Sequence, residues 1–542
     1  MDPTEPTRTG RGGRVARVLS GALVLALTGG VAALAVAAPA DEPGTVPAAA
    51  VDVDPAATTL VCPGPLQLPD DSVSGDAAFD RVPVDPVESV SAFDTVLSGT
   101  GSLTELGGEP VALADGTATV DSPAAATILR AEPADGAPAL VAGATSSIVT
   151  DGDLRGLSAA SCARPSADVW LVGGSTELES TADLVVVNPG ATAADVTVEA
   201  WGPSGAVDLA SGGSFLVAPG AQRVVTLPGV AAEQRRLAVR VTAAGGQVSA
   251  YLQDALLDGF TPRGTDLVTA GAAPATTQVV PGISVTETEV GAADAGALRL
   301  LVPGEQDASV SVRLLGPDGD VPLPGAEDLD LPAGEVTDVS LGGLGSGTYT
   351  AVVESSEAVV AGAMITRDGD AGELDEGPRL ERAWASSVPT GGGLVAVPAD
   401  TRGQVALTAV PTGDEPADAT PSPSPSPEPT EGQRPDPEAD AEPAGPTVTV
   451  TVRAYGPSGV LGEEDVEVPV GSTVQYEVRE LGREAVGIEV VTPDDPAARV
   501  AWALVTSLPS ADGTLISVLS PLTDAEAVSQ ARVREGSRVG LD

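Results

Sequence analysis

The residues of this chain that could support catalysis are carboxylates. The sequence has 77 aspartates and glutamates and no histidine. Without histidine, the usual serine and cysteine hydrolase machinery and most zinc sites are ruled out. A glycoside hydrolase needs two carboxyl groups across a sugar-binding cleft, and such clefts usually present aromatic platforms. The whole chain has four Trp, four Tyr and four Phe, so we predict that it is not an enzyme and has no catalytic residues.

Three Asp-Gly-Asp motifs suggest calcium, because hard cations take several oxygen ligands from loops. They lie at residues 151–153, 318–320 and 368–370. None has the full spacing of an EF-hand loop, and aspartate and glycine are also common turn residues. We interpret the motifs as turns, and we predict no metal site and no cofactor.

The two cysteines, Cys62 and Cys162, lie beyond an N-terminal apolar segment that predicts export. Exported chains enter a compartment that permits oxidation. We predict that these two residues form a disulfide, with two buried free thiols as the alternative. In the chain-entropy model, closing a loop of about 100 residues stabilises the fold by ~4 to 5 kcal/mol.

The apolar segment, residues 18–38, follows a basic segment, residues 1–17, that contains four arginines, and an acidic stretch comes after it. This charge order places the N-terminus inside the cell. The 21 uncharged residues are long enough to cross the bilayer as a helix. The small residues Ala38–Ala40 also form an acceptable cleavage site. We therefore expect a transmembrane anchor, with the bulk of the chain outside the cell membrane, or a cleaved signal and a secreted protein.

Composition favours an all-β fold. The chain of 542 residues is 42% hydrophobic, enough for several cores, but only 2% aromatic, and it has 64 Gly and 48 Pro. This pattern is typical of many short strands separated by turns. The formal net charge of −50 repels polyanions, so we exclude nucleic acid as a partner.

A ten-residue motif occurs three times, as VTVEAWGPSG at residues 196–205, VSVRLLGPDG at 310–319 and VTVRAYGPSG at 450–459. Alternating valines before Gly-Pro-x-Gly predict a half-buried strand that ends in a tight turn. Another apolar stretch with a Pro-containing end precedes each copy, and we expect the two strands to form a hairpin. Trp201 and Tyr455 occupy equivalent positions before the turn, where the second copy has Leu315. We expect them to pack at an edge or between modules, and a ligand platform is the alternative.

The third copy contains a Pro- and Ser-rich insertion, residues 414–445. The proline that ends the preceding stretch lies 13 residues before the first glycine of the motif in the first two copies (Pro189 to Gly202 and Pro303 to Gly316). In the third copy this spacing is 45 residues, from Pro411 to Gly456. We predict that the insertion is a disordered loop within the module and not an interdomain linker, because lengthening a surface loop costs only ~0.6 kcal/mol per doubling.

These repeats predict an all-β chain of tandem β-sandwich (Ig-like) modules after the N-terminal helix. A linker at residues 39–57 leads to a divergent β domain at 58–165, which the disulfide closes. Modules one, two and three follow at residues 166–275, 276–380 and 381–510, and a C-terminal tail with a short helix occupies residues 511–542.

The stretches CPGP at Cys62, CARPSADVWLVGGS from Cys162, and LVVVNPG with VTVEAWGPSG together resemble an uncharacterised actinobacterial family, catalogued as domain of unknown function 5719. The resemblance covers most of the exported chain. It implies a secreted or membrane-anchored envelope protein with no assigned activity.

We therefore expect a non-enzymatic, exported cell-envelope protein with a structural or interaction role. Its partners would be the membrane, through the N-terminal helix, and an envelope protein or glycan. The alternative is a carbohydrate-binding accessory protein or an enzyme acting on cell-envelope glycan. A cleft that joins Trp170 or Trp201 with two carboxylates would favour that alternative.

Overall fold

The computed structural model describes residues 49–52, 55–67, 86–96, 100–412, 445–523 and 530–533, apart from positions 135, 293, 324, 327, 373, 374, 376, 494, 496 and 497. The chain divides into two compact units, residues 54–527 in one and residues 1–53 with 528–542 in the other. In the latter, β1 (Ala49–Asp52) pairs antiparallel with β36 (Gln530–Val533). The predicted N-terminal helix at 18–38 lies outside the described residues. Within the described ranges, no helix is long and apolar enough to cross a membrane.

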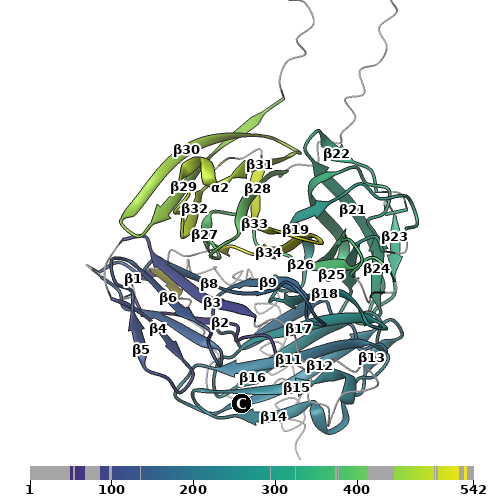
Figure 1. Ribbon diagram of the computed structural model, residues 1–542, viewed down its shortest axis with the longest axis horizontal. Helices are drawn as coiled ribbons and strands as arrows, with labels where there is room; N and C mark the ends of the chain where they lie inside the picture. Colours follow the sequence, from purple (N-terminus) through teal and green to yellow (C-terminus); the bar gives the residue numbers. More distant parts are fainter. Residues whose placement is uncertain are drawn as a thin grey trace, which may run out of the picture. The chain divides into compact units, whose positions relative to one another are not determined.

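The prediction of an all-β fold is confirmed, because antiparallel strands make up nearly all of the regular structure (Figure 1). Within the unit 54–527, the strands of the described residues form four β-sandwiches, which we name A, B, C and D in chain order. In each sandwich, apolar residues from two layers of strands enclose one core.

Sandwich B shows the arrangement most simply. Its first sheet has the order β10 (Asp168–Val172), β16 (Ala238–Ala244), β12 (Ala194–Gly202) and β13 (Gly205–Val207), and β14 (Ser214–Val217) also pairs with β12. Its second sheet has the order β15 (Ala221–Thr226), β11 (Ser180–Asn188), β17 (Ser249–Asp258) and β18 (Thr261–Val268). The alternating Val196 and Val198 of β12 share a core with Leu184 of β11, as a period-two strand pattern requires.

Sandwich A repeats this order without the Gly-Pro-x-Gly motif. Its sheets are β2 (Thr58–Cys62), β7 (Thr127–Ala131), β4 (Gly101–Glu105) and β5 (Pro110–Ala112), and β6 (Thr117–Asp121), β3 (Val87–Asp94), β8 (Val141–Val149) and β9 (Gly156–Ser161). The divergent segment therefore has the same topology as the recognisable repeats.

Sandwich D follows the same order with one addition. Its sheets are β35 (Leu522–Thr523), β27 (Gly393–Ala396), β32 (Gly487–Val491), β29 (Thr447–Gly456) and β30 (Gly459–Pro469), and β31 (Thr473–Glu477), β28 (Arg402–Pro411), β33 (Ala498–Ser510) and β34 (Gly513–Leu519). A single helical turn, α2 (Val478–Leu481), joins β31 to the segment before β32.

In sandwich C, one long strand belongs to both layers. The first part of β25 (Gly347–Asp368) pairs with β19 (Ala275–Val285) and β21 (Ala308–Gly316), and its second part pairs with β20 (Ala297–Leu301) and β26 (Leu380–Ser386). The short strands β22 (Gly319–Val321) and β23 (Leu329–Leu331) extend the first layer, and β24 (Val336–Ser340) extends the second. In sandwich B, a turn separates the corresponding strands β16 and β17.

The predicted hairpin before each motif is wrong. Strands β11 and β12 lie in different sheets, and so do β28 and β29. The connection crosses from one layer to the other, and both strands show the same period-two pattern because both face the same core. The hairpin that does exist joins β12 to β13 through the motif itself, and its last glycine has a φ of +113° at Gly205. Only glycine adopts such a conformation at low cost.

Sheet pairing also shifts two predicted boundaries. β26 belongs to sandwich C, so the boundary predicted at residue 380 falls at the start of a strand of that sandwich. β34 belongs to sandwich D, although we placed it in the tail from residue 511. In that tail, residues 530–533 form a strand where we expected part of a helix. The division into separate modules stays a prediction, since residues 54–527 form one compact unit.

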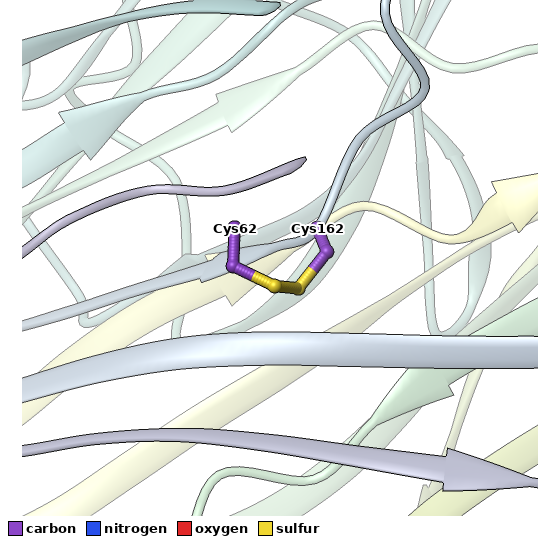
Figure 2. The surroundings of a disulfide bond; sticks show 2 residues. All are labelled: Cys62 and Cys162. Carbon is purple, nitrogen blue, oxygen red and sulfur yellow. A yellow bond between two sulfur atoms is a disulfide. The ribbon is translucent and has the colours of Figure 1, made fainter. Parts of the chain in front are cut away.

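The predicted disulfide is present. Figure 2 shows Cys62, at the end of β2, bonded to Cys162, just after β9, with an S–S distance of 1.96 Å. Both residues belong to the core of sandwich A. Because β2 and β9 lie in different sheets, the bond fastens the two layers of this sandwich together.

The connection between β28 and β29 provides a test of the fold. Five residues, 189–193, cross between the equivalent strands of sandwich B, whereas residues 412–446 do so in sandwich D. Of the insertion 414–445, only Gly445 lies within the described residues. Deleting residues 414–445 from the full chain should leave cooperative thermal unfolding intact, with a midpoint that is unchanged or higher by about 2–4 °C, because a shorter loop costs less closure entropy.

The matched control deletes residues 189–193, which leaves no chain to cross between the layers of sandwich B and should abolish cooperative unfolding. If deleting residues 414–445 were equally damaging, the insertion would be a packed element of the fold.

Candidate functional site

One edge strand from the second layer of each sandwich contacts the corresponding strands of its neighbours. β9 contacts β18 and β34, and β26 also contacts β18 and β34. The four strands thus form a closed cycle of contacts from A through B, C and D back to A. Sandwiches A and D are the first and last in the chain order, so contacts between their side chains must hold the cycle closed.

A buried ion-pair network joins A, C and D. Arg155, which precedes β9 and is 1% exposed, donates to both carboxylate oxygens of Asp512 at 2.6 and 3.1 Å and to Glu381 at 3.4 Å. Oε1 of Glu381, on β26, accepts hydrogen bonds from the backbone N–H of Leu157 on β9 at 3.0 Å and of Ile516 on β34 at 3.1 Å. One carboxylate therefore holds the edge strands of two other sandwiches.

A second buried carboxylate joins B to C, D and A. Asp266 on β18 accepts a hydrogen bond from the backbone N–H of Trp384 at 2.8 Å, and its other oxygen lies 3.0 Å from Oγ of Ser517. That hydroxyl also accepts from the Ala159 N–H at 3.1 Å and lies 3.0 Å from the Ala159 carbonyl. The Ser517 hydroxyl has only one proton. If it donates this proton to the Ala159 carbonyl, a protonated Asp266 carboxyl can donate the hydrogen bond to Oγ of Ser517.

A third pair links B to C. Asp254 on β17 accepts from Arg382 and from the indole N–H of Trp384, both at 2.9 Å. Both members of the ion pair are buried. The strands approach closely because Gly264 has no side chain: its φ is +96°, and a Cβ there would lie 2.5 Å from the backbone nitrogen of Arg382.

The carboxylates of this network have perturbed pKa values. Burial raises the pKa of Glu381 to about 8, against the opposing effect of the hydrogen bond from Leu157 and the charge of Arg155. Burial also raises the pKa of Asp266 well above its usual range. At Asp512, burial raises the pKa, but hydrogen bonds from Arg155 and Arg379 outweigh it and lower the pKa to about 2.

Perturbed carboxylates are candidates for catalytic groups. Glu381 and Asp266, however, are fully buried, and their oxygens are occupied by strands of neighbouring sandwiches. A substrate would have to displace bonds that hold the fold together. The chemistry of this network is therefore structural: it closes the cycle of sandwiches.

Sequence reasoning placed none of these residues in a site. The signal was present, since a charged residue interrupts each of the apolar stretches YLQDALL, GTDLV and LERAWA at Asp254, Asp266 and Glu381–Arg382. A charge inside a buried strand needs a partner. The sequence could have indicated buried pairs in this way, but not which strands they join.

The Asp-Gly-Asp motifs at 151–153 and 318–320 lie at bends or turns, whereas the one at 368–370 lies at the end of β25. The first and third of these motifs border the network. Asp151 pairs with Arg379 at 3.1 Å, and the backbone N–H of Asp370 donates to the carbonyl of Asp512 at 2.8 Å. The motif at 318–320 is the turn between β21 and β22, where Asp320 lies 3.6 Å from Arg313. In the part of the chain that the structure describes, no group of three or more possible ligands could hold a metal ion.

In each sandwich, one residue that directly precedes a turn glycine lies where two sandwiches meet, and we call each such contact a seam. The four glycines are Gly107, Gly202, Gly316 and Gly456. Leu106 of A packs with Val185 and Val187 of B. The remaining contacts are Trp201 of B with Leu301 and Val336 of C, Leu315 of C with Val410 and Ala501 of D, and Tyr455 of D with Phe93 of A at a ring-centroid distance of 5.6 Å. The repeated motif thus supplies one contact to each of three seams of the cycle, and Leu106, which lies outside the motif copies, supplies the contact at the fourth.

The ring of Trp201 also borders a surface cleft of about 490 Å³ that includes Glu199 and Asp208. Trp201 is only 9% exposed and stacks on Trp170 at 5.4 Å. Glu199 pairs with Arg240 at 3.4 Å, and Asp208 accepts from the backbone N–H of Ala210 at 2.8 Å. The cleft joins tryptophan with two carboxylates, but the indole faces the seam more than the solvent.

The fold and the network define an all-β protein of four sandwiches closed through a buried ion-pair network. The family described as "Family of unknown function (DUF5719)" matches residues 117–434. The match covers more than half of the chain, so the protein belongs to this family. Its actinobacterial source and its secretion stay predictions.

No curated protein matches the chain by sequence. Among solved structures, the crystal structure of Thermotoga maritima 1070 shares 15% identity, covering 21% of this chain and 95% of that chain with a TM-score of 0.16. The BSP domain of a biofilm associated protein shares 10% identity, covering 87% of this chain and 97% of that chain with a TM-score of 0.13. TM-scores this low support no inference about fold or function.

The raised pKa of Glu381 predicts how stability depends on pH. Its pKa of about 8 in the folded state lies above the usual value of 4.5, so between these limits the folded protein binds more protons than the unfolded protein. The free energy of unfolding should therefore fall as pH rises from about 5 to about 8, by at most ~1.4 kcal/mol per pH unit for this group. Urea unfolding at four pH values in this range measures the slope.

Glu381→Gln should flatten this slope, since glutamine does not ionise, while the buried Asp266 keeps its own contribution. Glu467→Gln, at an exposed position on β30, is the matched control and should leave the slope unchanged. An equally steep slope in the Glu381→Gln variant would contradict the assignment.

Proposed function

We propose that this protein is a non-enzymatic, exported cell-envelope protein with a structural or interaction role. The observation that carries the proposal is the position of its perturbed carboxylates. Glu381 and Asp266 are buried between strands of different sandwiches and hold them together. The groups best suited by pKa to acid–base chemistry thus stabilise the architecture.

The disulfide supports the exported location. Disulfides persist in oxidising compartments and are rare in the cytosol, and Cys62 and Cys162 are bonded. The arginines and apolar residues at the N-terminus are the export signal that we infer from the sequence. We propose that the chain stays at the membrane through this segment, with the bulk outside the cell, or is released by cleavage. An envelope protein or glycan is the proposed partner.

The cleft beside Trp201 favours a second candidate function, a carbohydrate-related accessory or enzymatic role. It places Glu199 and Asp208 in one hollow with an aromatic ring. The low exposure of Trp201 and the existing partners of both carboxylates favour the first proposal.

Complementation of a deletion strain separates the two candidates, with resistance to envelope stress as the measurement. The Glu199→Gln/Asp208→Asn variant should restore resistance fully, because the proposed role needs no carboxylate chemistry in the cleft. Arg155→Ala should fail to restore it, because the buried Glu381 loses its cation, Asp512 keeps only Arg379, and stability falls by ~3–5 kcal/mol.

Circular dichroism and secretion level serve as controls for folding. A well-folded Glu199→Gln/Asp208→Asn variant that fails to complement would overturn the non-enzymatic proposal in favour of the glycan-directed alternative.

A further inference from the structure

We propose that a cleft at the seam between sandwiches A and D binds an acidic saccharide, a glycan with carboxylate groups. The cleft has a volume of about 590 Å³, within the size range of small-molecule sites. The inference rests on the proposed non-enzymatic binding role and deepens it by naming the chemistry of the partner.

The walls of the cleft come from both ends of the cycle. Sandwich A supplies Ser91 on β3 and Thr119 on β6. Sandwich D supplies residues 397–403, where β28 begins, and residues 477–479 and 482–486 around α2 (elements labelled in Figure 1). A ligand in this cleft would touch the first and last sandwiches together and stabilise the closed cycle.

Three arginines line this cleft in a protein of net charge −50. Arg479 lies 3.5 Å from Glu477. Arg402 and Arg483 are exposed, and within the described residues the guanidinium group of neither makes an ion pair or a hydrogen bond. Free guanidinium groups bind carboxylates through two parallel hydrogen bonds. Although Asp400, Glu477 and Glu484 balance the three arginines in formal charge, the guanidinium groups of Arg402 and Arg483 are available to pair with carboxylates of a ligand.

The remaining lining suits a sugar better than a bare anion. Asp400 and Glu484 share the cleft with the arginines; they would repel a small dianion but can accept hydrogen bonds from sugar hydroxyls. The buried residues Val397, Pro398 and Val478 form an apolar part of the wall, against which the C–H face of a sugar ring can pack.

The cleft continues into a second hollow of about 270 Å³ that shares Thr119, Ala399 and Asp400 with it. This hollow follows β3 and β6 past Ser89 and Ser122. Glu88, Asp121 and Asp400 also line this second hollow, and none of the described arginines does. It therefore offers room for sugar hydroxyl groups, whereas the carboxylates of the ligand would lie beside the arginines of the first cleft.

The test is isothermal titration calorimetry of the full chain with trigalacturonate at low salt. We expect saturable binding that weakens about tenfold for each arginine removed, in Arg402→Gln and Arg483→Gln, because each loses a charge-assisted contact. Thr119→Trp, which fills the cleft from the side of sandwich A, should abolish binding. Arg235→Gln is the matched control, since this exposed arginine lies on sandwich B outside the cleft.

Two comparison ligands distinguish the sources of affinity. Neutral maltotriose should not bind, and inorganic phosphate should bind far more weakly than trigalacturonate. Equal binding of phosphate would overturn the saccharide assignment. The site would be overturned if trigalacturonate did not bind, or if it bound equally well to an Arg402→Gln/Arg483→Gln variant with native-like thermal unfolding. Either result would leave the non-enzymatic proposal standing. Binding followed by cleavage of trigalacturonate would support the site and overturn the non-enzymatic proposal.

Discussion

The carboxylate of Glu381 is the interaction on which the closed arrangement depends. It receives backbone hydrogen bonds from β9 and β34 and faces the guanidinium of Arg155. Unpaired edge strands are a liability, because their free N–H groups invite pairing with other chains. Here, the edge strands β9 and β34 both lie beside Glu381 on β26. Its carboxylate accepts one backbone N–H hydrogen bond from each of them. Breaking a buried pair of this kind by removing one partner is strongly destabilising, because the remaining group is left buried without its partner.

The repeated motif and the network act at different places in the cycle. The network joins the edge strands β9, β18, β26 and β34, whereas the residue before each turn glycine fills a seam, as Trp201 and Leu315 do. The side chain at this position is leucine, tryptophan or tyrosine, and its size adapts one topology to four different neighbours. The seam between A and D uses Tyr455 against Phe93 and also contains the arginine-lined cleft. The proposed binding cleft and one contact that closes the cycle therefore lie in the same part of the molecule.

The sequence was sufficient to predict strands, turns and the disulfide because these are local or compositional features. Alternating valines and Gly-Pro-x-Gly identified β12 and its turn, and a chain with two cysteines has one possible intramolecular pairing. The crossing between β11 and β12 was mistaken for a hairpin, since strands on opposite sides of one core have the same alternation. The network could not be predicted, because the partners Arg155 and Asp512 are 357 residues apart and no local pattern relates them.

Native-state hydrogen exchange of the backbone amides of Leu157 and Ile516 tests most directly whether Glu381 closes the cycle. Both amides donate to its carboxylate from different sandwiches. If closure is part of the cooperative structure, both should exchange only through global unfolding, with the same opening free energy as the core amide of Leu184. Exchange of both through a local opening that costs several kcal/mol less, roughly half the global value or below, would show that the sandwiches separate without unfolding and would contradict the account.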